Sequence, residues 1–398
     1  MSLLTIEERR APARKGWAPF ALGFRPFFLG AGAAALVLMA LWLLWLRGTL
    51  APPAWRYAPV LWHAHEMLFG FGAAVIAGFL LTAARNWTGL PTPQGTTLAL
   101  LFGLWFLGRI AFLLPGLPAA LVLALDLAFL PAVAVALARP ILRARQARNY
   151  AFPLILGALT VAAALMDLQM LGYTQTTAAA GTALAVYLIV LMMVMMGGRV
   201  IPFFTDARVG GQTHRWQAVE WLAPVSAAAV GGGVLLAPHS LYTTLAATAA
   251  AGINLLRLAG WQRRALWQVP LLWVLHLGYA WIVLGFALTA LAAAGRVPVS
   301  LALHAYTVGA IGGLTLGMMA RVSLGHSGRP LVPAPVMTAA FVAVNAAALL
   351  RVILPLLWPA AYGAALLLGG LAWLFAFAVF LAVYFPILLR PRLDGKPG

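Results

Sequence analysis

The chain has 398 residues, of which 64% are hydrophobic and only 9% are charged. Soluble domains carry roughly a quarter charged residues, so this composition excludes a water-soluble globular protein and indicates an integral membrane protein. The chain has no cysteine, which excludes disulfides and thiolate metal ligands. The formal net charge of +18 would suit nucleic-acid binding, but the placement of the basic residues points to membrane topology instead.

Apolar runs of about 20 residues, each long enough to cross a bilayer as a helix, follow one another along the chain. We predict an all-α polytopic membrane protein, a bundle of about twelve transmembrane helices, with the seventh and eighth the weakest. The whole chain, 1–398, is predicted as a single transmembrane helical-bundle domain with cytoplasmic tails at 1–19 and 389–398. The predicted spans are 28–47, 61–84, 97–114, 118–138, 151–171, 180–200, 217–236, 241–258, 267–293, 301–320, 334–354 and 360–388.

The basic residues fall almost entirely on one side of these predicted helices. Arg47, Arg56 and Arg296 fall on the opposite side, and Arg109 and Arg351 lie within helices. Every other Lys or Arg lies in the N-terminal segment, in loops on that same side, or in the C-terminal tail. This positive-inside bias predicts that both termini are cytoplasmic, so the charge sets topology and predicts no nucleic-acid partner.

Histidines near the ends of two predicted helices are the first candidates for a functional site, because ionisable groups inside a membrane are functional candidates by default. His65 lies on the second helix and His304 on the tenth. At 1.5 Å per residue, both lie roughly 10 Å to the periplasmic side of the bilayer centre. Such a pair could ligate a haem iron from both faces, share a metal, or reach water at the interface. We predict His65 and His304 as cofactor or metal ligands.

The second helix also carries His63 and Glu66 in the stretch Trp62 to Met67. His63 and His65 are about 200° apart around a helix, so one face cannot present both. Either His63 lies in a non-helical segment after Pro59, or the two histidines serve different sites. Glu66 is one turn from His63 and could orient an imidazole, ligate a metal or relay protons, unless it pairs with the backbone or Arg56. We predict His63 as a metal ligand and Glu66 as the catalytic candidate.

His276 and His326 are candidates for a second layer. His276 falls roughly 6 Å to the cytoplasmic side of its helix centre, too far in depth for the layer of His65 and His304. We predict it as a cofactor or metal ligand, alone or with His326. His326 lies in a glycine-rich turn with Arg321 and Arg329, which could hold anionic groups such as propionates or simply anchor the turn. His326 and Arg321 are therefore predicted as cofactor-binding residues.

Two further groups are weaker candidates. Asp126 and Asp167, in the fourth and fifth helices, could carry protons, neutralise Arg109 or satisfy helix packing. A run of methionines in the sixth helix offers soft donors of the kind copper favours, although methionine is also common on bilayer-facing helices. These methionines are Met192, Met193, Met195 and Met196.

A weak internal repeat links the second and tenth helices. Both His65 and His304 are followed by glycine at positions +5 and +13. Small residues at such spacing let helices approach closely. These glycines are Gly70, Gly78, Gly309 and Gly317.

Seven segments in order along the chain resemble one family, the NnrS family. They are Phe20 to Phe28, Trp62 to Met67, Gly78 to Gly89, Gly198 to Thr205, Trp273 to Trp281, His304 to Gly313 and Arg321 to Pro330. The resemblance implies a multi-pass protein of the bacterial inner membrane that contains haem, expected to be b-type, and copper, and that is tied to nitric oxide and nitrosative stress.

Two hypotheses for function follow from this resemblance. The first is a haem-dependent oxidoreductase of the nitric oxide reductase type, which binds nitric oxide and reduces it with electrons from an unidentified donor. The alternative is a transporter, or a protein that handles haem, copper or iron–nitrosyl species without redox turnover. The spacing of helices two and ten also loosely resembles the haem–copper oxidase arrangement. That likeness concerns the fold alone, because helices six and seven hold no histidine for the usual three-histidine metal site.

Overall fold

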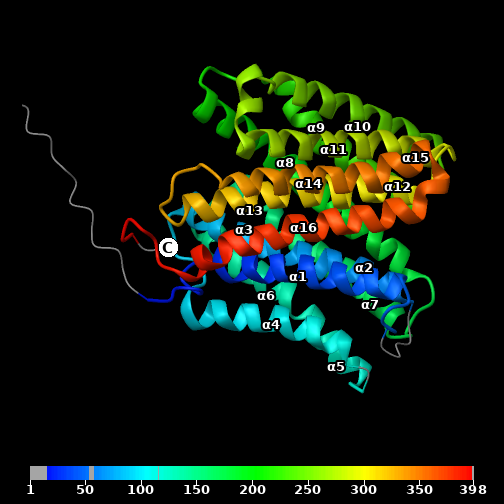
Figure 1. Ribbon diagram of the computed structural model, residues 1–398, viewed down its shortest axis with the longest axis horizontal. Coiled ribbons are helices and arrows are strands. Elements are labelled where there is room, and N and C mark those ends of the chain that lie inside the picture. The colour runs from blue at the N-terminus through cyan, green and yellow to red at the C-terminus, as the bar shows by residue number, and fades with distance from the viewer. Residues whose placement is uncertain (1–15, 53–57, 115, 397–398) are drawn as a thin grey trace, which may run out of the picture.

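The computed structural model describes residues 16–52, 58–114 and 116–396, and these residues form helices and no strand (Figure 1). Each of the twelve predicted spans coincides with a long helical segment, so the prediction of an all-α bundle is confirmed. Of the basic residues used to predict topology, five lie outside the described residues. They are Arg9, Arg10, Arg14, Lys15 and Arg56.

Several of the long helical segments change geometry along their length. Three contain a π-helical stretch, η1, η4 or η5, and short 3₁₀ turns precede three others. In chain order the elements are α1 (Phe24–Leu46), α2 (Pro59–His65), η1 (Glu66–Gly72), α3 (Ala73–Thr88), α4 (Gly95–Leu113), α5 (Ala119–Leu127), α6 (Phe129–Arg143), η2 (Ala147–Asn149), α7 (Ala151–Met170), α8 (Thr177–Val209), α9 (Gln217–Leu236), α10 (Leu241–Gly260), η3 (Arg264–Gln268), α11 (Pro270–Ala293), α12 (Val299–His304), η4 (Ala305–Gly312), α13 (Gly313–Gly325), α14 (Pro335–Ala348), η5 (Leu349–Ile353), α15 (Leu354–Leu357), η6 (Pro359–Ala361) and α16 (Tyr362–Leu389).

Eleven helical segments in the described residues are long and apolar enough to cross a membrane. The remaining long helix is α10, which coincides with the eighth predicted span and carries Arg257 near its end. The Arg257 guanidinium is buried, where it pairs with Glu220 at 2.5 Å and donates a hydrogen bond to the Val194 carbonyl at 2.8 Å. This arginine, expected in a loop, therefore lies inside the bundle, because a local carboxylate and a backbone carbonyl stabilise its charge.

The helix α8 extends beyond its predicted end. The sequence predicts a span that stops at residue 200, but the helix continues to Val209 and includes Pro202. In its last turns, the Asp206 carboxylate accepts hydrogen bonds from the Thr213 amide at 2.7 Å and hydroxyl at 3.1 Å. Asp206 thus ties the loop that follows back onto the helix.

The long helices lie roughly parallel to one another along the longest axis of the molecule (Figure 1). Packing pairs α1 with α16 and α3, α7 with α8 and α6, and α10 with α9 and α11. In Figure 1, α9 and α10 form one margin of the bundle and α4 and α5 the other, with α1, α3, α13 and α16 between them. The histidine-bearing segments α2 and α12 lie toward the end of the bundle opposite the C-terminus.

Arg25 joins the first and last helices. Its side chain is fully buried, and Nη1 donates to the carbonyls of Leu388 at 3.0 Å and Arg390 at 2.5 Å. The last carbonyls of a helix lack intrahelical donors, so a cation at this place is stabilising. A residue expected in the N-terminal basic segment therefore caps α16 and brings both ends of the described chain to one side of the bundle.

The glycines of the predicted repeat lie at close contacts between helices. A Cβ at Gly309 would come within 2.4 Å of Trp281, and one at Gly317 within 2.7 Å of Val274. A Cβ at Gly78 would meet Phe27 at 2.9 Å, and one at Gly70 would meet Arg109 and Leu38 at 3.2 Å. Only a residue without a side chain lets these segments approach so closely.

Candidate functional site

The three π-helical segments mark one region of the bundle. The segment η1 begins directly after His65, η4 begins directly after His304, and η5 contains Arg351. A π-turn widens the helix by one residue and occurs frequently at functional sites. The sequence repeat that starts at His65 and His304 is therefore also a repeat in backbone geometry.

A cavity of about 370 Å³ lies beside all three π segments and is lined by His63, His304 and Arg351. This volume falls within the range of small-molecule and cofactor pockets. The remaining wall is mainly apolar and comes from α1, α8, α14 and α16 as well as from the histidine-bearing segments. An apolar cavity with two imidazoles and one guanidinium on its wall has the composition of a site for a largely apolar ligand that carries an anionic group.

The two imidazoles of this cavity are held in different ways. His304 Nδ1 lies 2.7 Å from the Ser300 carbonyl, which can only accept, so Nδ1 carries the proton and Nε2 keeps its lone pair. The His63 ring stacks on Trp42, with 4.4 Å between ring centroids and 13° between planes. His63 Nδ1 is buried without a hydrogen-bond partner. Both rings are therefore fixed in orientation, and each has ligating capacity to spare.

Arg351 brings an incompletely satisfied positive charge to the cavity. Its Nη2 donates to the Tyr362 hydroxyl at 3.3 Å, and the guanidinium lies 5.2 Å from the centre of that ring. Its Nη1 is buried without a hydrogen-bond partner. A buried cation in this state favours an anionic partner such as a carboxylate. The sequence placed Arg351 within a helix but gave no reason to associate it with the histidines.

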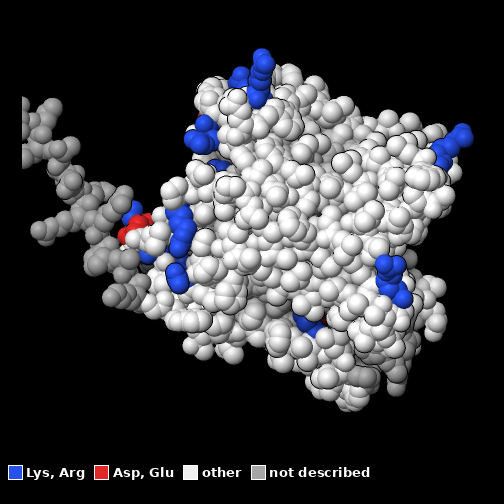
Figure 2. All heavy atoms as spheres, viewed as in Figure 1, with Lys and Arg blue, Asp and Glu red and all other residues white. Residues whose placement is uncertain are grey.

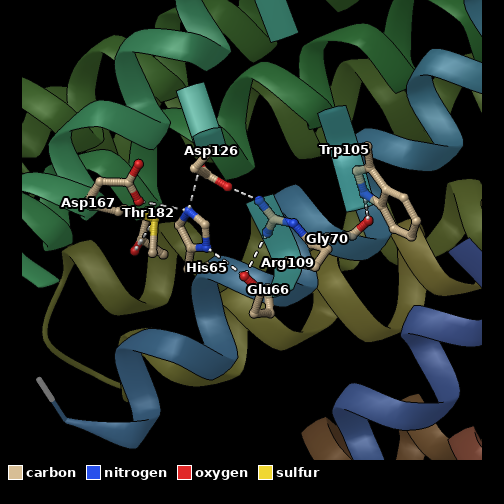
Figure 3. Close-up of polar contacts among 9 residues, drawn as sticks. His65, Glu66, Gly70, Trp105, Arg109, Asp126, Asp167 and Thr182 are labelled. Carbon is tan, nitrogen blue, oxygen red and sulfur yellow. Dashed lines mark hydrogen bonds and ion pairs between the residues drawn. The ribbon is translucent and has the colours of Figure 1, made fainter. Parts of the chain in front are cut away.

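His65 lies apart from this cavity, in a buried polar cluster (Figure 3). Its Nδ1 is 3.1 Å from Glu66 Oε1, and its Nε2 is 3.0 Å from Asp167 Oδ1 and 3.4 Å from Asp126 Oδ2. Arg109 pairs with Glu66 at 2.6 Å and also with Asp126. The polar cluster, His65, Glu66, Arg109, Asp126 and Asp167, includes one group, His65, Asp126 and Asp167, that could hold a metal ion.

The positions of these side chains distinguish between several alternatives that the sequence leaves open. His63 is helical, and it lines the cavity while His65 lies in the polar cluster, as their angular separation predicts. His304 lines the same cavity as His63, so the structure does not bring His65 and His304 into one site. Asp126 neutralises Arg109, one of the roles predicted for it. Glu66 is bound by Arg109 and does not line the cavity.

The residues of the predicted second layer lie on different elements. His276 is buried in α11, where Nδ1 donates to the Leu272 carbonyl at 3.0 Å. His326 caps α13, with its ring 5.7 Å from that of Phe24. Burial lowers the pKa of His326, and the nearby charges of Arg392, Arg25 and Arg85 lower it further.

Arg321 contacts an aromatic ring, and three of the predicted methionines line a second cavity. The Arg321 guanidinium lies 3.8 Å from the centre of the Phe204 ring, a cation–π contact. Met192, Met193 and Met196, with Met318, line a second, apolar cavity of about 90 Å³. No imidazole or carboxylate lines this second cavity.

The family model described as NnrS protein matches residues 18–392, nearly the whole chain. No curated protein matches this sequence.

Proposed function

Because this chain belongs to the NnrS family, we propose that it is a haem-binding protein of the bacterial inner membrane that acts in nitric oxide metabolism or nitrosative-stress resistance. It is a polytopic membrane protein. The haem would be b-type, and the cavity lined by His63 and His304 would hold it. When bound, haem supplies an iron that binds nitric oxide and, with electrons from a donor, can reduce it.

The observation that carries this proposal is the pair of imidazoles, His63 and His304, on one apolar cavity beside an unsatisfied Arg351. Haem is a flat apolar macrocycle with two propionate groups, so it needs apolar walls, axial donors and a cation. Ser300 fixes the tautomer that leaves Nε2 of His304 for ligation. Arg351 would hold a propionate. Apolar walls also admit nitric oxide from the lipid phase and keep water out.

Glu66, the catalytic candidate from the sequence, has no proton-transfer role in this proposal. Both Arg109 and His65 engage its Oε1, and the residue is not part of the cavity wall. A general acid or base must be within hydrogen-bond reach of the group that it serves, or one water away. We therefore assign no proton step to Glu66.

Copper, which the family resemblance also implies, fits the residues present less well than haem. Copper(I) favours thioether and imidazole donors, and copper(II) favours imidazole. Among the described residues, the methionines of the second cavity have no imidazole beside them, whereas Met39 and Met67 share the first cavity with His63 and His304. We derive no chemical step through copper.

The topology of the proposal places both termini in the cytoplasm. Figure 2 shows that the Lys and Arg side chains gather at the end of the molecule that carries the C-terminal tail, with few at the opposite end. Basic residues are retained on the cytoplasmic side during insertion. The cavity with His63 and His304 then lies toward the periplasmic side. Reporter fusions at the C-terminus test this orientation: a signal from the periplasm would overturn it.

Optical spectroscopy of the purified protein tests the proposed function. The reduced protein is expected to show a Soret band that shifts when nitric oxide is added. His304→Ala should lose most of the haem, whereas His239→Ala, which replaces an exposed histidine in a loop, should retain it. A wild-type protein reconstituted with haem that shows no Soret band would overturn the proposal. Substrate flux in proteoliposomes without nitric oxide consumption would favour the transporter alternative.

A further inference from the structure

Five ionisable side chains from four helical segments meet in the polar cluster, away from the proposed haem cavity (Figure 3). His65 and Glu66 come from the α2–η1 junction, Arg109 from α4, Asp126 from α5 and Asp167 from α7. The side chains of the histidine and the three carboxylates are at most 1% exposed. Such a concentration of charge inside a membrane bundle requires a compensating interaction.

Three of these side chains point donor atoms at one shared space. His65, Asp126 and Asp167 each offer one ligand atom, and these atoms all lie within 4.8 Å of one another. His65 Nε2 and both oxygens of Asp167 are buried and form no hydrogen bond, although Nε2 and Oδ1 are only 3.0 Å apart. The contact between them is therefore close without the alignment of a hydrogen bond. Lone pairs directed at a common point are the arrangement that a metal ion requires.

The tautomer of His65 supports the same conclusion. Its Nδ1 lies 3.1 Å from Glu66 Oε1, and that carboxylate is also bound by Arg109 at 2.6 Å. An ionised carboxylate can only accept, so Nδ1 carries a proton. A cation bound between Nε2, Asp126 and Asp167 would take the place of a second proton on Nε2, which faces these two carboxylates. A carboxylate that orients a histidine through one ring nitrogen while the other ligates a metal is the usual second shell of a protein metal site.

The carboxylates of the polar cluster outnumber its cations, and the excess is largest when His65 is neutral, the form that ligates a metal. Arg109 is the single cation against the carboxylates of Glu66, Asp126 and Asp167, and it pairs with the first two of these. With His65 neutral, the polar cluster carries two uncompensated negative charges. An uncompensated charge in a buried site is strongly unfavourable, and a divalent cation would cancel both.

We propose that His65 Nε2, Asp126 Oδ2 and Asp167 bind a divalent transition-metal cation of the zinc type, separate from the haem. One imidazole and two carboxylates suit zinc or manganese better than copper(I), which favours softer donors. Asp126 serves both partners, because its Oδ1 faces Arg109 and its Oδ2 faces His65. The ion ties α2, α5 and α7 together at one point of the bundle. This proposal stands whether or not the cavity binds haem.

Metal analysis of the purified protein tests the site. Wild-type protein, stripped with a chelator and titrated with Zn²⁺, is expected to bind about one equivalent with a Kd at least tenfold lower than that of Asp167→Asn or Asp126→Asn. The matched control is Asp206→Asn, which replaces a carboxylate bound to Thr213 outside the polar cluster and should bind Zn²⁺ as the wild type does. Substituting Co²⁺ for Zn²⁺ should give the visible absorption of a low-symmetry site, absent from Asp167→Asn.

Two outcomes would overturn this proposal. One is a stripped wild-type protein that binds neither Zn²⁺ nor Co²⁺, which would mean that protons compensate the carboxylates instead. The other is Zn²⁺ binding of equal strength in the wild type, Asp126→Asn and Asp167→Asn. If the variants fail to fold, the wild-type titration and the loss of thermal stability on chelation still decide. His304→Ala should retain the cation while it loses haem, so failure of one proposal is distinguishable from failure of the other.

Discussion

Two regions that begin two residues apart on one helix have opposite designs. His63 faces an open, apolar cavity whose one cation, Arg351, lacks a full set of partners. His65 faces a closed set of ion pairs with no comparable free volume, in which charges contact one another directly. We propose that the first region binds a large ligand that carries negative charge. We propose that the second binds a small cation. One helix contributes to both regions because successive side chains point in different directions around its axis.

The largest expected effect comes from replacing each of the two histidines in turn and comparing how much haem each variant binds. His63→Ala is expected to reduce bound haem at least about tenfold, because it removes an axial donor, whereas His65→Ala should retain haem. The haem content per protein, measured as the pyridine haemochrome, decides. Retention by His63→Ala together with loss by His65→Ala would reverse our assignment of the two faces.

Removing the cation of the polar cluster should have the next largest effect. Arg109→Leu leaves Glu66 and Asp126 without their positive partner and should cost about 3–5 kcal/mol of unfolding free energy. Thermal unfolding in detergent measures this, with Arg47→Leu as the control because Arg47 is exposed. Equal stability of the two variants would contradict the ion-pair network.

A substitution in η4, whose neighbouring residues Val308 and Ile311 line the cavity, perturbs this region from behind its wall. Gly309→Ala places a methyl group 2.4 Å from Trp281 and should cost about 1–3 kcal/mol while it weakens haem retention. The control is Gly232→Ala in α9, where nothing lies within 4 Å of the added Cβ. Unfolding and haem content are measured on both, and an unchanged Gly309→Ala would show that η4 is free to shift.

Charge on the cavity wall is expected to contribute less. Arg351→Gln should weaken haem binding about tenfold, or about 1.4 kcal/mol, because a charge-assisted hydrogen bond to a propionate is lost. Haem transfer to apo-myoglobin provides the measurement, with the exposed Arg296→Gln as control. Identical transfer rates would remove Arg351 from the proposed site.

Removing an ion pair at the surface should change the free energy of unfolding least, and it serves as the reference for the buried ion pairs. Arg392, at 2.5 Å, lowers the pKa of Asp394 below its ordinary value. A depressed pKa contributes stability above the ordinary carboxyl range and loses it as the pH falls through the lower folded value. Because the pair is partly exposed, Asp394→Asn should change unfolding by less than about 0.5 kcal/mol at neutral pH. A loss of unfolding free energy as large as that of Arg109→Leu would mean that exposed and buried ion pairs contribute equally to stability.

Sequence periodicity predicts much of this architecture, and its failures have physical causes. Runs of apolar residues locate every long helix, and the angle between His63 and His65 predicts that they face different surroundings. Depth along a helix could not choose between these two, since they differ by only about 3 Å along the axis. The choice depends on how the helix is rotated against its neighbours, which packing decides.

The polar cluster was only partly accessible from the sequence for a related reason. Asp126 and Asp167 stand out as acids within apolar runs, and pairing with Arg109 is one of the roles expected for them. That His65 joins them requires four separate helical segments to converge, which no local pattern encodes. The π segments, likewise, are marked in the sequence only by glycines that follow the histidines.

The Arg25 contact has a consequence for how the bundle is assembled in the membrane. Its carbonyl partner at Leu388 lies 363 residues further along the chain. Synthesis proceeds from the N-terminus, so α1 enters the bilayer long before α16 exists. The contact can therefore form only when translation is almost complete, and until then the groove on α1 that receives the last helix faces lipid or the insertion machinery. Packing of α16 against α1 is thus a late step of biogenesis. Loss of α16 would leave α1 without this packing partner.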